Sequence, residues 1–186
     1  GVRSVNPDAT VEVNWTFTWY NPATEKEAAI ALLDKGCDVI AQHQDTTAPQ
    51  QAAQDRGKWA IGYNCDTSDI VPEAFLTAPV WNWGPYYADQ VKKVMDGTWK
   101  SENYWGGMED GVVDLAPLTK NAPAGAQEKV DEAKKKILSG EWDVFHGPIK
   151  DQSGNIKVPE GSSLTDEELL TMEWFVEGVI GTIPKE

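Results

Sequence analysis

The chain has 186 residues, which is enough for one ordinary domain or an unequal pair of domains. Sixteen Lys and Arg against thirty Asp and Glu give a formal charge of −14, spread along the chain without an acidic tail. That charge repels nucleic acid and anionic membrane surfaces, so neither is expected to be a partner. The sequence contains no apolar run near the ~20 residues that a membrane helix needs.

The first predicted elements are a strand and a helix. Residues 11–19 alternate apolar and polar side chains, which is the pattern of a half-buried strand. Asn21 and Pro22 then provide the cap and the first residue of a helix that ends near Lys35 and Gly36. A strand that leads directly into a capped helix is typical of α/β proteins.

The second predicted strand, residues 38–41, ends in a run of polar side chains. Residues 42–45 read Gln-His-Gln-Asp, and a loop without a function does not need four such groups in succession. Thr46 or Thr47 is expected to cap the next helix, residues 48–56. Open α/β sheets bind ligands at the carboxyl ends of their strands. We therefore expect residues 42–45 to form one wall of a small-molecule site.

Two further strands are predicted at residues 59–63 and 75–80, and a helix at residues 84–95. Pro79 has no N–H for a sheet ladder, so it indicates an edge strand or a chain that leaves the sheet there. Strands that alternate with helices at this spacing favour right-handed crossovers and a parallel sheet.

The second half of the chain has a different pattern. Short extended pieces are predicted at residues 104–108 and 112–115, around a Gly-rich bend, and an amphipathic helix at residues 126–138. Residues 144–158 are expected to form a β-hairpin about a Ser-Gly turn. A short final helix is expected to start near residue 165.

Polar and aromatic side chains follow all four predicted strands. The carboxyl ends of parallel strands meet at one edge of a sheet, so these side chains are expected to cluster. Flat aromatic faces beside amides and carboxylates suit a heteroaromatic ligand. The residues expected to bind it are Trp19, Tyr20, His43, Asp45, Asn64, Asp66, Trp81, Asn82 and Trp83.

Catalysis is less well supported by the sequence than binding. His43 and Asp45 could form an acid/base pair, but the chain lacks a GxSxG nucleophile motif, a GxGxxG motif and a phosphate-binding GxxxxGK[ST] loop. With two Cys and two widely separated His, no structural zinc site is expected. We therefore predict no catalytic residues, no metal and no cofactor.

Several motifs follow one another in a distinctive order. They are residues 1–7 (GVRSVNP), 20–23 (YNPA), 36–42 (GCDVIAQ), 61–66 (IGYNCD), 110–117 (DGVVDLAP) and 147–154 (GPIKDQSG). In this combination the chain resembles the basic membrane protein (BMP) family. Its members are substrate-binding lipoproteins of ABC importers, related to the purine nucleoside receptor.

The resemblance implies an α/β fold of type I periplasmic-binding-protein type, with two parallel-sheet lobes that close on a ligand. It implies that this chain is incomplete. Residues 1–80 would supply most of the second lobe, without its first strand and helix. Residues 81–186 would supply a crossover, a helix and the C-terminal hairpin segments. The N-terminal lobe would come from outside this chain, or a second copy would take its place.

The implied function is extracytoplasmic capture of a purine base or nucleoside, in the periplasm or at the cell surface, and delivery to an ABC permease. A leader is not part of this sequence, and a lipid anchor outside it would make the membrane contact. Trp81 stands where some nucleoside-binding relatives have a basic residue, which favours adenine or adenosine over an oxo-purine. The alternatives are a nucleoside hydrolase-like enzyme and a sugar-sensing regulator domain on the same fold.

Overall fold

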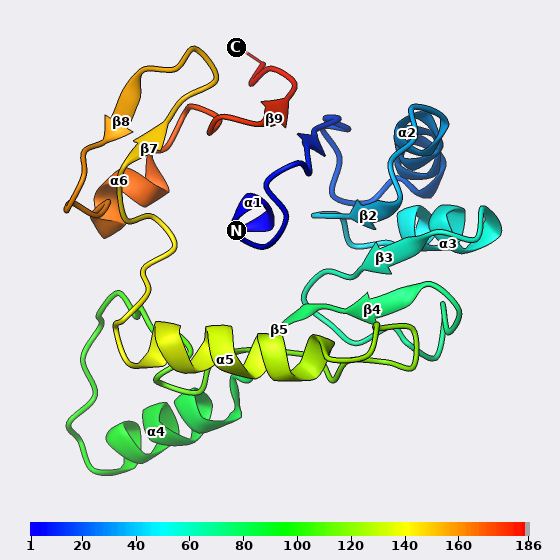
Figure 1. Cartoon of the computed structure of the whole chain (residues 1–186). Coiled ribbons are helices and arrows are strands. Elements are labelled where there is room, and N and C mark those ends of the chain that lie inside the picture. Colours follow the sequence, from blue (N-terminus) through cyan, green and yellow to red (C-terminus); the bar gives the residue numbers. More distant parts are fainter. Residues whose placement is uncertain (185–186) are drawn as a thin grey trace. The chain divides into compact units, whose positions relative to one another are not determined.

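The computed structural model describes residues 1–184 and forms two compact units (Figure 1). The first unit combines residues 1–15 with residues from 128 onward, and the second consists of residues 16–127. Helices and strands are mixed in both, and the second unit contains a parallel sheet, which confirms the predicted fold class. The predicted division between residues 80 and 81 concerns a complete two-lobe fold and stays a prediction.

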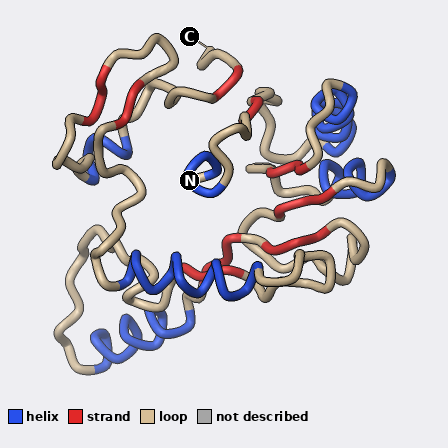
Figure 2. The backbone as a smooth tube through the Cα atoms, in the orientation of Figure 1, coloured by secondary structure: helices blue, strands red, loops and turns tan. Residues whose placement is uncertain are grey.

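The second unit is built on a three-stranded parallel sheet. Its strands are β2 (Val39–Ala41), β3 (Trp59–Ile61) and β4 (Phe75–Thr77), in the order β2-β3-β4 (Figure 2). In the register, Ala60 in the middle of the sheet pairs with Ile40 on one side and with Phe75 on the other. The carboxyl ends of three predicted strands therefore do lie at one edge.

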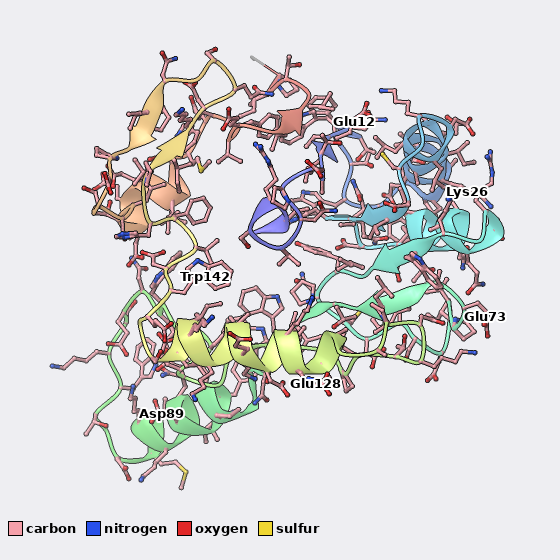
Figure 3. All side chains as sticks on the ribbon, viewed as in Figure 1. Glu12, Lys26, Glu73, Asp89, Glu128 and Trp142 are labelled. Atoms are coloured by element: carbon pink, nitrogen blue, oxygen red, sulfur yellow. The ribbon has the colours of Figure 1, made fainter. Side chains whose placement is uncertain are left out.

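One helix precedes β2 and another connects β2 to β3, and both begin where the sequence predicts. In α2 (Pro22–Asp34) the Asn21 side chain accepts the Thr24 N–H at 3.2 Å. In α3 (Ala48–Asp55) the Thr46 hydroxyl accepts the Ala48 N–H at 3.3 Å. In α3 the capping residue itself, Thr47, makes no such bond, but both hydrogen bonds satisfy N–H groups that a helix leaves unpaired at its start. Surface ion pairs such as Lys26 with Asp55, at 3.1 Å, add a contact between the two helices (Figure 3).

Small side chains make the core between these helices and the sheet. Ala53, Ala60 and Ala74 are fully buried, and Ile40 and Leu33 pack with them. Alanine side chains at these positions let the helix backbones approach the sheet closely. The short strands are thus stabilised by the helices as well as by their ladder.

A second buried cluster lies at the end of β4, around the ring of Phe75. Val71, Ala78 and Ala116 pack with it. A Cβ at Gly62 would lie 2.8 Å from Phe75 Cε2, so only glycine fits at that position without displacing the ring. This requirement ties the carboxyl end of β3 to the core.

The prediction of one continuous strand at residues 75–80 is wrong in its extent. The parallel strand β4 ends at Thr77, and β5 (Pro79–Trp81) pairs antiparallel with β6 (Val113–Leu115). The chain leaves the sheet near Pro79, as the missing N–H of that residue predicts. A single parallel bridge between Val80 and Asn64 keeps the start of β5 beside the loop after β3.

The predicted strand at residues 11–19 is also wrong in extent and in partner. Only β1 (Val11–Glu12) forms, and it pairs in parallel with β9 (Val179–Ile180) of the first unit instead of the three-stranded sheet. The N-terminal segment of the first unit ends at residue 15, and Phe17 has a left-handed backbone with φ of 54° that breaks the extended run. Alternating apolar and polar residues predict that a strand has one buried and one exposed face. A strand also needs a neighbouring strand for its backbone hydrogen bonds, and the pattern does not specify one.

The remaining elements largely follow the sequence. In the second unit, α4 (Gly84–Met95) begins at the predicted residue, while residues 104–107 form no strand. α1 (Val2–Val5) and most of α5 (Ala126–Leu138) belong to the first unit.

The first unit also holds the predicted hairpin and final helix. Strands β7 (Ile149–Lys150) and β8 (Ile156–Val158) pair antiparallel. The short α6 (Asp166–Leu170) begins with a capping box, in which Thr165 and Glu168 bond each other's backbone N–H. Among the described residues, each helix is too short or too polar to cross a bilayer.

Candidate ligand-binding site

The loops after β2 and β3 meet at the carboxyl edge of the sheet. The rings of His43 and Tyr63 lie 5.2 Å apart and are tilted by 42°. The backbone N–H of Asp45 donates to the Trp19 carbonyl at 2.9 Å. The segment before α2 therefore reaches this edge through the loop of β2, although it is not a strand of the sheet.

A buried carboxylate holds two of these segments together. Glu25, 1% exposed, accepts the Asn21 N–H at 2.6 Å and the Thr46 hydroxyl. The Thr18 hydroxyl donates to the same carboxylate at 3.4 Å. Our sequence reasoning did not single out Glu25, although an acidic side chain in the first turn of an Asn-capped helix was a usable signal.

The loop after β2 is shaped by its glutamines. Gln42 is buried, and its Nε2 donates to the carbonyls of Gln44 and Thr46 at 2.8 and 2.6 Å. Gln44 in turn donates to the Thr16 hydroxyl at 3.1 Å. The glutamines thus have a structural role, whereas His43 and Asp45 are exposed and can reach a ligand.

The loop after β3 meets β5 through a side-chain hydrogen bond. Asn64 has a left-handed backbone with φ of 60°, which asparagine tolerates better than most residues. Its Oδ1 accepts the Trp81 indole N–H at 2.8 Å. Trp81 also stacks on Trp83, with ring centroids 5.5 Å apart and planes 16° apart. One side-chain amide and two indole rings are therefore collected in one place.

Two of the predicted residues also have structural roles. Asp66 Oδ1 accepts the Ser68 N–H at 2.9 Å, which fixes a turn. Asn82 bonds Val112 through its backbone N–H at 2.7 Å and Gly111 through its side chain at 3.2 Å. Both side chains are exposed, so these bonds are compatible with a ligand contact.

The structure thus joins the predicted residues in small groups. Trp19 meets Asp45, and Asn64 meets Trp81, which stacks on Trp83. Tyr20 directly follows Trp19 in the sequence and is 74% exposed. That these residues bind a ligand stays a prediction. The sequence reasoning overlooked Tyr63 and three tyrosines near Trp83, which are described below.

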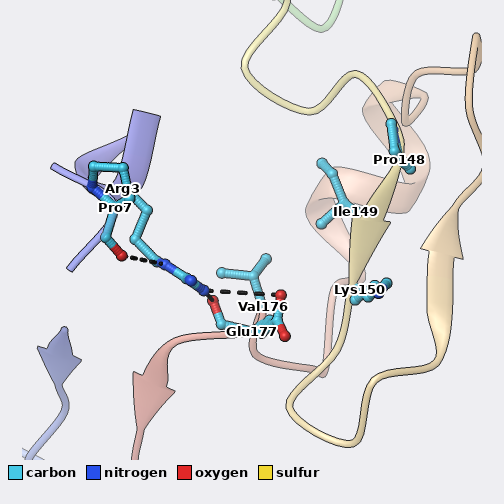
Figure 4. Close-up of a pocket in the computed structure, with 7 residues that line it drawn as sticks. All are labelled: Arg3, Pro7, Pro148, Ile149, Lys150, Val176 and Glu177. Atoms are coloured by element: carbon cyan, nitrogen blue, oxygen red, sulfur yellow. Dashed lines mark hydrogen bonds and ion pairs between the residues drawn. The ribbon is translucent and has the colours of Figure 1, made fainter. Parts of the chain in front are cut away.

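The first unit has a hollow of its own, remote in sequence from the predicted residues. It measures about 320 Å³ and is lined by Arg3, Pro7, Pro148, Ile149, Lys150, Val176 and Glu177 (Figure 4). The Arg3 guanidinium bonds the Pro7 carbonyl at 3.2 Å and pairs with the Glu177 carboxylate at 3.8 Å. These bonds tie the N-terminal segment to the C-terminal one, so we assign this hollow a structural role.

Solved structures place this fold among the solute-binding proteins of ABC transporters. The structure is similar to such a protein from Conexibacter woesei, with a TM-score of 0.65 and 25% identity, over 77% of this chain and 49% of that one. It also shares its fold with a transcriptional activator of the comK gene from Bacillus halodurans, with a TM-score of 0.62 and 24% identity, over 71% of this chain and 47% of that one.

Residues 1–162 match the family described as Bmp, ABC transporter substrate-binding protein PnrA-like, and the chain belongs to that family. A purine-binding protein of Brucella abortus is 45% identical over 185 residues, which are 100% of this chain and 53% of that protein. A putative ABC transporter glucose-binding protein of Haloferax volcanii is 40% identical, over 99% of this chain and 44% of that protein. The chain spans about half the length of these relatives.

Proposed function

We propose that this chain is part of an extracytoplasmic substrate-binding protein that captures a purine base or nucleoside and delivers it to an ABC permease. Stacking of Trp81 on Trp83 beside Asn64 is the observation that carries the proposal. Indole faces stack on a purine ring, and a side-chain amide reads its edge. The purine-binding relative at 45% identity supports the same ligand class.

Adenine or adenosine is the favoured ligand. Its 6-amino group donates and a neighbouring ring nitrogen accepts, a pattern that an Asn side chain matches with two hydrogen bonds. Asn64 Oδ1 already accepts the Trp81 N–H, but an amide oxygen has two lone pairs and Nδ2 has two N–H groups. None of the nine predicted residues is Lys or Arg. An oxo-purine would therefore lack an ammonium or guanidinium donor for its carbonyl oxygen.

Binding without chemistry fits this arrangement better than hydrolysis. The family is described as substrate-binding, and His43 lies against Tyr63 at 5.2 Å, a contact between rings. The rival reading, a nucleoside hydrolase-like enzyme, requires release of free base from adenosine. Chromatography of adenosine incubated with the purified chain distinguishes the two, because the proposal expects the nucleoside to remain intact.

A sugar is the second candidate ligand. The relative from Haloferax volcanii is named as a glucose-binding protein and is 40% identical. Aromatic faces beside Asp and Asn side chains also suit a sugar ring and its hydroxyl groups. If a sugar is the ligand, glucose is expected to bind to the same exposed side chains that we propose for adenine.

Titration calorimetry tests these choices directly. The purified chain is titrated with adenine, adenosine, inosine, guanosine and glucose under the same conditions. We expect adenine or adenosine to bind most tightly. Binding of the oxo-purines alone would contradict the choice of adenine, and binding of glucose alone would replace the purine proposal by the sugar one.

A further inference from the structure

Four aromatic side chains surround a second hollow in the unit of residues 16–127. Trp83, Tyr86, Tyr87 and Tyr104 line it, and its volume is about 290 Å³. We call it the tyrosine pocket. Trp83 directly precedes α4, Tyr86 and Tyr87 lie in its first turn, and Tyr104 comes from the loop that follows this helix. A pocket walled entirely by rings offers π faces to whatever enters it.

The rings face the pocket at different angles. Tyr86 and Tyr104 have centroids 4.3 Å apart and planes 40° apart. Trp83 meets Tyr86 edge-on at 5.9 Å and 69°, and lies nearly parallel to Tyr87 at 6.2 Å and 25°. Ring centroids 4.3 to 6.2 Å apart are in direct contact, so a flat ligand cannot enter between any two of these rings. The rings together line the pocket as a cup, which a compact group fits better than a flat one.

The loop that bears Tyr104 is fastened to α4. The Trp99 indole N–H donates to Gln90 at 3.0 Å, and the Lys93 ammonium pairs with Glu102 at 3.5 Å. At Gly106, any Cβ would overlap the Tyr104 hydroxyl, so the glycine lets the ring lie against the backbone. These contacts therefore hold Tyr104 in position beside the rings at the start of α4.

The surroundings of the cup are acidic. Burial among its neighbours raises the pKa of Tyr104, and the negative charges of Asp110, Glu109 and Asp89 raise it further. Asp89 lies on α4 (Figure 3). It pairs with Lys93 at 2.9 Å, so that ammonium group is already engaged. The chain as a whole carries a formal charge of −14. A cation is attracted to this pocket, and an anion is repelled.

We propose that the tyrosine pocket binds a small organic cation of the quaternary ammonium class. A methylated ammonium group is rounded and apolar at its surface yet carries a full positive charge. It therefore gains both from the negative faces of the four rings and from the carboxylates beyond them. The site is additional to the purine site and does not rest on it, although Trp83 contributes a ring to both.

Choline and its neutral isostere, 3,3-dimethyl-1-butanol, provide the test. The two differ only in a quaternary nitrogen against a quaternary carbon. Calorimetry on the purified chain is expected to give choline a dissociation constant on the order of 1 mM, and the neutral compound at least about tenfold weaker binding. Failure of choline to bind, or equal binding of the two compounds, overturns the proposal.

Three variants locate the binding. Tyr104→Ala is expected to weaken choline binding by roughly fivefold or more, because a face of the cup is lost, whereas Tyr104→Phe keeps it within about twofold. Glu109→Gln, at an exposed position, removes charge without touching the rings and should weaken choline alone. Trp59→Phe, on β3, is the control and should change nothing.

The outcomes remain decisive if Tyr104→Ala fails to fold by circular dichroism. In that case Glu109→Gln carries the test, and choline binding that is indifferent to this change overturns the proposal. Adenine titrated into the same variants reports separately on the purine site, so failure of one proposal is not mistaken for failure of the other.

Discussion

The Trp81 indole N–H donates a 2.8 Å hydrogen bond to the Asn64 side-chain oxygen, and this bond joins the last residue of β5 to the loop after β3. The bond fixes which end of the Asn64 amide carries the oxygen. It also sets the plane of the Trp81 ring, which stacks on Trp83. The polar and the aromatic parts of the proposed purine site are therefore positioned by one contact.

The Trp81→Phe variant separates the contribution of that hydrogen bond from the contribution of the aromatic ring. Phenylalanine keeps an aromatic face but removes the N–H, and a lost hydrogen bond of this kind costs ~0.5–1.5 kcal/mol. We expect adenine to bind about two- to tenfold more weakly, and Trp81→Ala to bind it more weakly still. Calorimetry measures both, with Trp59→Phe as the control. Unchanged binding in Trp81→Ala would remove Trp81 from the site.

Glu25→Gln tests the buried carboxylate beneath the loops. Glutamine has the same shape, but its NH₂ group cannot accept from the Thr46 hydroxyl and the Asn21 N–H as the two carboxylate oxygens do. A buried donor left unsatisfied costs ~1–3 kcal/mol, and we expect a loss of stability in that range. Urea unfolding measures it. Glu27→Gln, on the exposed side of the same helix, is the matched control and should stay within about 0.5 kcal/mol.

Gly62→Ala is expected to destabilise the fold through crowding. The added methyl group would lie 2.8 Å from Phe75 Cε2 and 3.2 Å from Ala78 Cβ, both fully buried. Overpacking of a core typically costs ~1–3 kcal/mol. Gly84→Ala is the control, because its methyl group would meet only the Asn82 Oδ1 at 3.7 Å. Equal thermal midpoints for the two variants would contradict this account of the core.

The hairpin of the first unit should lose stability in acid. Hydrogen bonds from Asn155 and the Ser153 backbone hold the pKa of Asp151 below its usual value of 3.8. A lowered pKa stabilises the fold above the usual value, and that contribution disappears as the pH falls through the folded-state pKa. Thermal midpoints measured from about pH 5 down to about pH 2 should therefore fall less steeply in Asp151→Asn than in the parent chain. Parallel curves would contradict this role.

Local signals predicted local structure well. The bounds of α5, the Asn21 cap and the hairpin at β7 and β8 follow from side-chain chemistry within a few residues, and the structure confirms them. The run at residues 11–19 failed as a strand because its partner, β9, is more than 160 residues away and pairs with only two of its residues. A pattern of alternation cannot specify such a remote backbone.

The sequence indicated candidate site residues that follow a predicted strand. It did not indicate residues that only the packing of distant segments brings together. Asn64 and Trp81 follow predicted strands and were expected to lie close together, and the structure joins them by a hydrogen bond, while their role in binding stays a prediction. Tyr86 and Tyr104 do not, and only the fold of the loop after α4 brings their rings to 4.3 Å. Glu25 was overlooked because a helical acid usually faces solvent, whereas the Thr46 and Asn21 donors justify its burial here.

The bonds of Glu25 and Gln42 also bear on the rate of the proposed ligand capture. They shape the loop at residues 42–46 with contacts drawn wholly from the chain itself. Ordering one backbone residue costs ~1–2 kcal/mol of conformational entropy. Because the five residues of this loop are already ordered, most of that cost does not arise when a ligand binds. Binding then requires no slow folding of the loop, so the association rate should approach the diffusion limit for a small molecule. Differences in affinity between ligands should therefore appear in the dissociation rate.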